Sequence, residues 1–370
     1  MQLGIFMQPV HDPARDLTEV LQQDRETILL ADRLGYSECW IGEHITATVE
    51  PITSPLVFLA SLIDGTRQIK LGTGVFCLAQ KHPAIIAAEA ALFDHLCKGR
   101  FNMGIGPGGL SSDLELFGAQ DPTVRAERTL ESIDMILKIW AQEPPYNLRG
   151  KHYSVTIADM SRKEFGVGCI PKPYQRPHPP LAVSLMSPES ANARIAGERG
   201  WIPLSGAAFV QPRYIRSHWE QFSRGAAAAG RSANRAIWRV CRSIMVFPSD
   251  TEADDYITNP KGPFNFYFRY VMSSFGQRNM LHLVRPDGRE QDASVSWLDI
   301  ARSQVAHGSP ARVLDQLVHL HERLGGFGVL VAIAHEWDDP AVCRRSMELL
   351  ATQVMPKLSQ HAASLRQVAE

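Results

Sequence analysis

The chain has 370 residues, of which 45 % are hydrophobic and 21 % are charged, and its formal net charge is −1. These proportions favour a large buried core and exclude a disordered chain. The near-neutral charge, without a long basic run, argues against nucleic acid or an anionic membrane as a partner, and no apolar run approaches the roughly 18–20 residues of a membrane span.

The amino-terminal segment MQLGIFMQPVHDPARD has no basic start and no small-residue cleavage site, so we expect a cytoplasmic protein. The cysteines are scattered and form no C-x-x-C pair. We therefore expect free, buried thiols and neither a disulfide framework nor a metal site.

Strand and helix patterns alternate along the first part of the chain. The predicted strands are 2–10, 37–44, 69–76 and 100–108, and the predicted helices that follow them are 16–35, 54–66, 82–99 and 123–142. The first of these helices ends in a glycine, and the second carries a proline in its first turn, both of which are typical of helix ends.

The alternation is interrupted twice. Residues 144–179 are rich in proline, glycine and basic residues, and we predict a short hairpin followed by an irregular insertion; residues 250–305 form a second irregular region. Insertions of this length suggest lids over a site. Between and after them the predicted strands are 180–187, 201–206, 238–247 and 327–337, each followed by a helix, at 188–200, 212–230, 309–325 and 339–358.

Repeated strand–helix units of this kind require a parallel sheet. Eight of them predict a (β/α)₈ TIM barrel of the α/β class, as a single domain over 1–370 with insertions after strand 4 and strand 7. An open, doubly wound sheet is the alternative. In a barrel the catalytic groups lie at the carboxyl ends of the strands, so the residues that end these strands are the first candidates for a site.

Glu43 and His44 end the second strand, Ser187 the fifth, and His335 with Glu336 the eighth. Adjacent strand residues point to opposite faces, so the side chains of Glu43 and His44 should point to opposite sides of the strand. Histidine can give or take a proton near neutrality. Glu43 could share in the chemistry or could only hydrogen-bond a backbone amide in the barrel mouth.

Serines mark the passage from the fifth strand to its helix. Ser187 and Pro188 suit the N-cap and the first helical turn, and Ser190 adds a second hydroxyl. A free helix N-terminus with hydroxyl donors can bind phosphate, although a plain capped helix would look the same. Arg125 or Arg128 could be a second phosphate ligand, or both could be solvated helix charges.

A pocket for an organic ligand would need further residues from the rim. His11 follows the first strand, and His82 could cap a helix or contact a substrate. The stretch GPFNFYFRYVMSSFG, which includes Phe266, would line an apolar pocket or a dimer contact. We expect the substrate pocket to be lined by His11, His82, His335 and Phe266.

With these residues in view, the chain resembles the bacterial luciferase-like flavin-dependent monooxygenases. The resemblance rests on GYSECWIGEHI, on the run from IKLGTGVF to KGRFNMGIGPG, on RTLESIDMIL and on the closing AHEWDDPA…MELLATQVMPKL. The closing segment is more similar to the limonene- and diketocamphane-monooxygenase branch than to luciferase itself.

The resemblance implies a two-component monooxygenase. Reduced FMN, supplied by a separate NAD(P)H:flavin reductase, would react with O₂ at C4a, and the resulting peroxide would oxidise a small apolar, terpene- or ketone-like molecule. It also implies a homodimer that pairs through the apolar helices 54–66 and 82–99. An F420-dependent oxidoreductase that transfers hydride, or a flavin-binding barrel without turnover, remains an alternative.

Carried onto this sequence, the resemblance makes His44 the residue that assists the flavin chemistry, with Glu43 as its acidic neighbour. Gly74–Val75 would be a non-prolyl cis peptide beneath the flavin. Ser187, Ser190 and Arg128 would hold the phosphate. Gly106 would also contact the cofactor, but Gly106–Pro107 stands where luciferase has a Cys-Arg pair, so one arginine contact to phosphate is lost.

Overall fold

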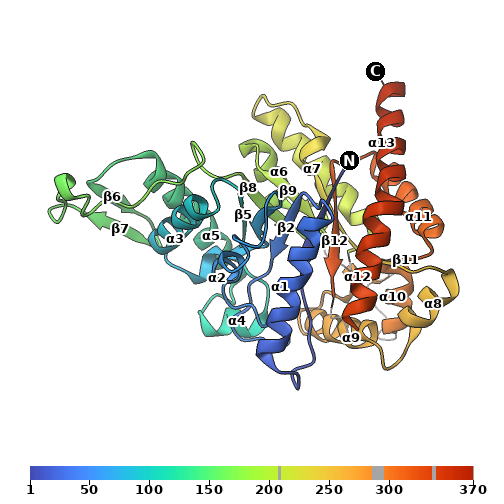
Figure 1. The fold of residues 1–370 in the computed structure, drawn as a ribbon. Coiled ribbons are helices and arrows are strands. Elements are labelled where there is room, and N and C mark those ends of the chain that lie inside the picture. The colour runs from blue at the N-terminus through green and yellow to red at the C-terminus, as the bar shows by residue number, and fades with distance from the viewer. Residues whose placement is uncertain (207–209, 286–295, 336–338, 370) are drawn as a thin grey trace.

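The computed structural model describes residues 1–206, 210–285, 296–335 and 339–369, and strands alternate with helices through this part of the chain (Figure 1). Among these residues eight parallel strands close into a ring, because β10 pairs with both β9 and β12 and the remaining strands follow in chain order. The ring consists of β1 (Gln2–Met7), β2 (Glu38–Ile41), β3 (Lys70–Thr73), β5 (Phe101–Gly106), β8 (Leu181–Leu185), β9 (Ile202–Ser205), β10 (Arg239–Val246) and β12 (Val329–Ala334). The predicted closed barrel is confirmed.

The strands read as apolar runs because both of their faces are covered, as is usual in parallel sheets. Every residue of β5 and of β12 is buried. Trp40 fills the barrel interior, and a Cβ atom added at Gly72 would lie 2.6 Å from its ring. Glycine in the third strand thus makes room for a large neighbour.

Helices surround the ring after each strand. They are α1 (Leu17–Arg33), α2 (Pro55–Ala60), α3 (Pro83–Leu96), α5 (Pro122–Ala141), α6 (Ala191–Arg199), α7 (Pro212–Ala228), α11 (Pro310–Leu324) and α12 (Pro340–Leu349). After α12 the chain continues through the π-helical turn Leu350–Val354 into α13 (Met355–Ala369). Capping residues set several of the boundaries: the Asp16 side chain accepts the N–H of Glu19 at the start of α1, and Gly325 takes a left-handed conformation after α11.

Shorter elements join the ring strands on the carboxyl side. β4 (Phe76–Cys77) pairs with β5, and a 3₁₀ turn, η1 (Leu78–Gln80), leads to α3. Helix α4 (Ser111–Leu116) follows β5. The remaining 3₁₀ turns of the described residues are η2 (Lys163–Phe165), η3 (Arg235–Ile237) and η4 (Leu281–Leu283).

The first insertion contains the predicted hairpin, formed by β6 (Tyr146–Arg149) and β7 (Ser154–Ile157), which pair antiparallel and project away from the barrel (Figure 1). The prediction of an irregular second insertion is wrong. Its described residues form α8 (Asp250–Thr258), α9 (Pro263–Gly276), α10 (Trp297–Gln304) and the strand β11 (Val305–Gly308), which pairs with β10. Apolar residues of α9 recur every three to four positions and are buried, which gives the segment a helical core-facing side.

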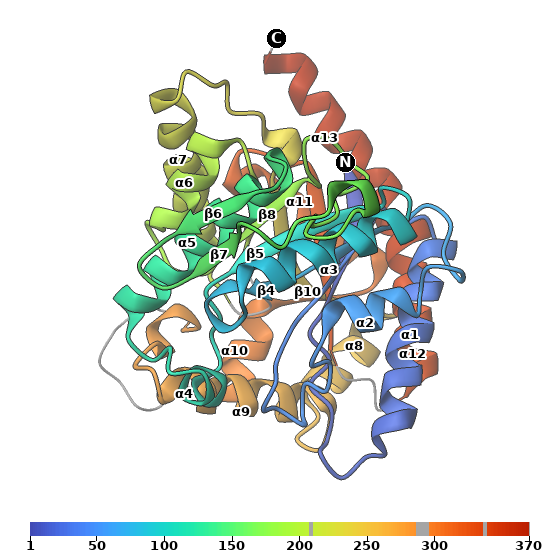
Figure 2. The same cartoon turned by 90° about the vertical axis from the view of Figure 1, so that its left-hand side faces the viewer.

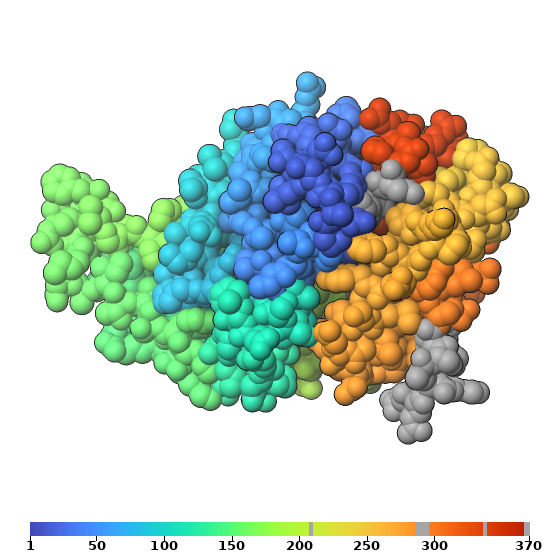
Figure 3. Space-filling model, turned by 90° about the horizontal axis from the view of Figure 1, so that it is seen from below, coloured from blue at the N-terminus to red at the C-terminus, as the bar shows by residue number. Residues whose placement is uncertain are grey.

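Helices α4 and α9 lie together at one end of the barrel, as two views at right angles agree (Figures 1 and 2). Seen from that end, the residues around α4 and those of the second insertion lie side by side on the surface (Figure 3). This is the end at which the ring strands finish, so the two helices cover the place where a barrel builds its site.

All six cysteines are free, and five of them are buried, as predicted. Within the described ranges, no helix combines the length and the apolar character that crossing a bilayer requires. Glu336, predicted to end the last strand, lies outside the described residues.

Candidate active site

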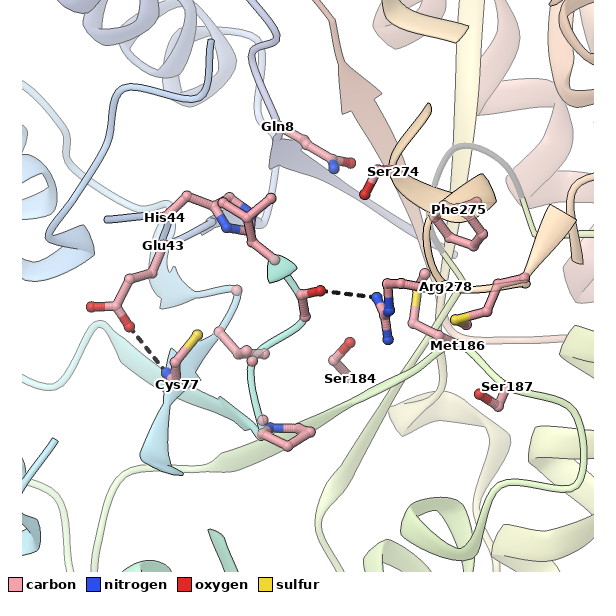
Figure 4. Close-up of a pocket in the computed structure, with 18 of the residues that line it drawn as sticks. Gln8, Glu43, His44, Cys77, Ser184, Met186, Ser187, Ser274, Phe275 and Arg278 are labelled. Atoms are coloured by element: carbon pink, nitrogen blue, oxygen red, sulfur yellow. Dashed lines mark hydrogen bonds between the residues drawn. The ribbon is translucent and has the colours of Figure 1, made fainter. Parts of the chain in front are cut away.

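A cavity of about 370 Å³ opens at the carboxyl ends of the strands. Its walls combine strand-end residues, among them His44, Val75 and Ser187, with residues of the insertion such as Tyr270 and Phe275. Segments far apart in the sequence therefore enclose one space (Figure 4).

His44 lies between two carboxylates at the mouth of this cavity. Its Nε2 is 3.3 Å from Oε2 of Glu50, and its Nδ1 is 3.5 Å from Oδ2 of Asp113. Burial by itself would lower the pKa of His44, but the charges of Glu50, Asp113 and Glu43 outweigh it, so the pKa is raised above its ordinary value. The imidazole thus holds its proton more firmly than a free histidine, while 23 % of the side chain stays exposed.

Asp113 is fixed by the loop that follows β2. Its carboxylate accepts the N–H of Thr46 at 2.8 Å and the N–H of Ile45 at 3.1 Å, and it also accepts the Thr46 hydroxyl. Burial would raise the pKa of Asp113, but these hydrogen bonds and His44 lower it to about 2. Helix α4 therefore delivers a permanent negative charge to one side of the imidazole.

Glu50 is fixed from the opposite direction. Its Oε1 accepts the hydroxyl of Tyr270, on α9, at 2.7 Å. The side chain is buried, and its second oxygen faces His44. A chain of contacts therefore runs from α9 through Glu50 to His44 and on to Asp113.

Glu43 lines the cavity, but its carboxylate turns away from His44 (Figure 4). One oxygen accepts the N–H of Cys77 at 3.0 Å, and the other contacts the ammonium group of Lys81. Both contacts are structural: they hold the loop after β3 against the end of β2. This arrangement supports the hydrogen-bonding interpretation of Glu43 rather than a share in the chemistry.

The floor of the cavity is built from small residues. The Gly74–Val75 peptide is cis, as the sequence led us to expect, and both residues line the cavity together with Gly106. A Cβ atom at Gly106 would lie 2.7 Å from Cγ2 of Val75. Glycine at this position leaves the Val75 side chain and the strand ends in close contact.

The opposite end of the cavity carries hydroxyl groups. Ser184, Ser187 and Ser190 line it, but the predicted capping is wrong: the N-cap of α6 is Ser190, not Ser187, and Pro188 precedes the helix. The Ser190 side chain makes no capping hydrogen bond, so its hydroxyl is left for another acceptor. His218 fixes this loop with a hydrogen bond of 2.9 Å from Nε2 to the carbonyl of Ser187, and burial lowers the pKa of His218 to about 4.

Two arginines face the same end. Arg125, at the start of α5, and Arg278, just after α9, both line the cavity. The predicted phosphate ligand, Arg128, does not. Its guanidinium donates to the carbonyls of Phe117 and Gly118, and it lines a separate surface pocket. The helical turn between 125 and 128 decides which arginine reaches the cavity.

The insertion supplies an apolar wall. Val271, Phe275 and Met280 line the cavity, as does Met186. Two polar side chains interrupt this wall, Gln8 and Ser274 (Figure 4). The Gln8 carbonyl oxygen accepts the Tyr267 hydroxyl at 3.3 Å, which leaves the amide NH₂ as the free donor. This wall of the cavity is therefore largely apolar, with few hydrogen-bonding groups.

None of the four predicted pocket residues lines this cavity. His11 is buried beside Asp24, and His335 is buried with Nε2 2.7 Å from the Ser243 hydroxyl; burial lowers the pKa of His335 to about 3. His82 caps α3 and lies in the pocket of Arg128.

Phe266 belongs to the predicted aromatic stretch but faces a third pocket, with Arg15 and Arg269. Tyr270 lies about one helical turn further along α9, and it lines the cavity, as do other residues of that part of the helix.

Sequence reasoning missed Gln8, Glu50, Asp113, Tyr270 and Arg278. Asp113 carried one usable signal, because it is an acidic residue shortly after the glycine-rich end of a strand. The described residues contain no group of three or more histidine, cysteine or acidic side chains that could hold a metal ion.

Comparison with known proteins places these features in context. Residues 1–326 match the family model described as luciferase-like monooxygenase. The 4-hydroxyprotoasukamycin monooxygenase of Streptomyces nodosus subsp. asukaensis is 32 % identical over 97 % of this chain and 92 % of its own length. The limonene 1,2-monooxygenase of Rhodococcus erythropolis is 29 % identical over 96 % of this chain and 86 % of its own length.

Among solved structures, the oxygenating constituent of 3,6-diketocamphane monooxygenase from Pseudomonas putida, a type II Baeyer–Villiger monooxygenase in complex with FMN, superposes with a TM-score of 0.86. It is 26 % identical, and the match covers 96 % of this chain and 98 % of that one. A Mycobacterium tuberculosis protein named for dependence on coenzyme F420 is 28 % identical over 63 % of this chain and 64 % of its own length. The predicted resemblance to the limonene and diketocamphane branch is confirmed.

Proposed function

The chain belongs to the luciferase-like monooxygenase family, and from this premise we propose that it uses reduced FMN and O₂ to oxygenate a small apolar, terpene- or ketone-like substrate. The observation that carries the proposal is the shared cavity: an acid–base histidine stands at one end, and serines and arginines fit for an anion stand at the other. A flavin mononucleotide has a reactive ring system at one end and a phosphate at the other, so its two ends match the two ends of the cavity.

The residues present fit such a cofactor. The unused hydroxyl of Ser190 and the guanidinium groups of Arg125 and Arg278 would hold the phosphate. Gly74, Val75 and Gly106 would support the flavin ring, because no side chain larger than valine projects from this part of the wall. When bound, the reduced flavin supplies two electrons and activates O₂.

His44 would manage the proton that such an oxygenation needs. It holds a proton between Glu50 and Asp113, and the exposed part of the imidazole allows exchange with a ligand in the cavity. Glu43 would have no direct part in the chemistry. Its role is to keep the rim in place through Cys77 and Lys81.

The apolar wall from α9 would serve two purposes. It would receive the substrate, and it would exclude water, which otherwise diverts activated oxygen into hydrogen peroxide. Val271, Phe275 and Met280 are the residues of the insertion that suit this role.

The proposal also names partners. As the family resemblance implies, we expect a separate NAD(P)H:flavin reductase to deliver the reduced cofactor. We expect a homodimer as well, since apolar side chains of α2 and α3 remain exposed.

The test is oxygen uptake by the chain with FMN, NADH and a generic flavin reductase, with and without a panel of terpenes and cyclic ketones. We expect an oxygenated product from at least one panel member that forms only when FMN and O₂ are both present. Turnover supported by reduced F420 in the absence of O₂ would instead show hydride transfer. Flavin binding without any product from a broad panel would favour a binding protein.

A further inference from the structure

Arg278 links the second insertion to the strand-end loop of the cavity. It comes directly after Gln277, the C-cap of α9, and its Nη1 donates to the carbonyl of Gly109 at 2.9 Å. The rest of the guanidinium group lines the cavity, on the same side as Ser184 and Ser187 (Figure 4). One side of the guanidinium group therefore donates to a backbone carbonyl, and the other side points into the cavity.

The charge of Arg278 has no carboxylate partner. Across the described ranges, no ion pair joins Arg278 or Arg125 to an acidic side chain, and the hydrogen bonds of both go to main-chain carbonyls. Arg125 and Arg278 line the same cavity, and the pKa of Arg278 is lowered by burial and by the positive charge of Arg125. Two neighbouring positive charges in a partly buried space favour an anion between them.

Further donors at this end of the cavity suit the same anion. The hydroxyl of Ser190 does not cap its own helix. The loop that carries it is tied to α7, because the Ser217 hydroxyl oxygen accepts the amide N–H of Glu189 at 2.9 Å. Asn192 also lines the cavity. Hydroxyl and amide donors together with two guanidinium groups suit a phosphate monoester.

We propose that Arg278 is the residue by which the insertion recognises the phosphate of the cofactor, so that the chain distinguishes FMN from riboflavin chiefly through this side chain. This inference rests on the proposed function, because it takes the anion to be the flavin phosphate. It has a structural consequence: α9 also carries Tyr270, which donates to Glu50, the partner of His44. The helix that leads to the proposed phosphate ligand thus also supports His44, the acid–base residue at the other end of the cavity.

The experiment compares the binding of FMN and riboflavin, which differ by the phosphate alone, to four proteins: the wild type, Arg278→Gln, Arg278→Lys and the control Arg269→Gln. Arg269 is exposed on α9 and lines another pocket. We expect Arg278→Gln to weaken FMN binding by roughly 10- to 100-fold, the usual loss for a hydrogen-bonded charge. Riboflavin binding should change by less than about twofold. Arg278→Lys should restore part of the preference for FMN, and Arg269→Gln should match the wild type.

Inorganic phosphate provides a second measurement that needs no variant. In the wild type it should compete with FMN but should not displace riboflavin. If Arg278→Gln weakened both flavins equally, Arg278 would only support the loop at Gly109, and the inference would be wrong; an unchanged FMN affinity would overturn it as well. A wild type that binds neither flavin would overturn the proposed function too. A wild type that binds FMN and riboflavin equally well would overturn this inference alone and leave the proposed function intact.

Discussion

His44 draws its chemical character from residues outside its own strand, Glu50 and Asp113. The histidine itself could be picked out because it ends a strand, and the alternation of side chains along a strand separates it from Glu43. Its partners Glu50 and Asp113 could not be identified in the same way. They arrive from a loop and from α4, and only the folded chain brings them within 3.3 and 3.5 Å of the imidazole.

Replacing Glu50 by Gln should move the pH dependence of substrate oxidation. The carboxylate helps to raise the pKa of His44, so its loss leaves burial to lower that pKa. If the reaction requires protonated His44, the wild type should lose activity only above the raised pKa of His44. The variant should lose activity at a lower pH. The measurement is the pH profile of product formation, with Glu26→Gln, an exposed carboxylate on α1, as the control.

The same shift has a consequence for stability. Because the folded pKa of His44 lies above the unfolded value, about 6.5, its stabilising contribution is complete below that value and disappears as the pH rises through the folded pKa. For Asp113 the sign is opposite: its contribution is complete above the unfolded pKa, about 3.9, and is lost as the pH falls toward 2.

For the activity measurement, an identical pH profile of product formation in wild type and Glu50→Gln would show that the Glu50 carboxylate does not tune the pKa of His44.

Ser190→Ala should weaken flavin binding by roughly 1–2 kcal/mol, the contribution of about one hydrogen bond to a charged group. The melting temperature of the apo protein should hardly change, since the hydroxyl makes no capping bond to its own helix. Isothermal titration and thermal melting of the same preparations give both values. An unchanged dissociation constant for FMN would remove Ser190 from the phosphate site.

At the level of elements, α9 shows what the sequence did not reveal. Its aromatic residues have only moderate helix propensity, and the stretch was predicted to be irregular. Yet Phe264, Tyr267, Phe268, Val271 and Phe275 are buried along one side of the helix. Packing of that side against the barrel end decides the conformation. The helical spacing of these apolar residues is the sequence feature that indicates a helix.

Several exposed apolar side chains lie on α2 and α3. Val57 is 72 % exposed and Leu92 59 %, and Ile85 and Leu96 are also exposed. We expect these side chains to be covered by a second copy of the chain. The double variant Val57→Glu/Leu92→Glu should then be a folded monomer, because a charge on each side of a symmetric interface repels its counterpart.

Light scattering at micromolar concentration gives the mass of each protein. Leu365→Glu, which places the same charge on an exposed leucine of α13, is the matched control and should remain a dimer. Thermal melting should show little loss of stability in either case, since exposed positions rarely contribute more than about 0.5 kcal/mol. A wild-type chain with the mass of a monomer would contradict the expected pairing.

For the whole molecule, the alternation of strand and helix was sufficient to predict the closed barrel, because parallel strands joined by helices leave few other arrangements. It was not sufficient to predict the cavity wall. Residues that meet there, such as Gln8, Arg125 and Tyr270, depend on helix rotation and on how the insertion folds back over the strand ends. Residues predicted from strand ends, such as Gly74, Gly106 and Ser187, do line the cavity. Arg128 and the predicted substrate residues His11, His82, His335 and Phe266 lie elsewhere.

The chain should bind reduced FMN more tightly than reduced F420. The anion-binding end offers one cluster of donors, Ser190 with Arg125 and Arg278, in a cavity of about 370 Å³, and this suits a single terminal phosphate. Anaerobic titrations of both reduced cofactors against the same protein make the comparison. A clear preference for F420 would contradict this assignment and would favour hydride transfer.

The central claim is that His44 directs the oxygen activated in this cavity to the substrate. It is tested most directly by comparing wild type with His44→Ala under ¹⁸O₂ and measuring labelled product per O₂ consumed, with FMN binding measured in parallel. The wild type should place one labelled oxygen atom in the product. His44→Ala should still bind FMN and consume O₂, but it should lose substrate oxidation by roughly 10²–10⁴-fold and release hydrogen peroxide instead. Labelled product formed by His44→Ala at the wild-type rate and coupling would show that the histidine is only a rim residue.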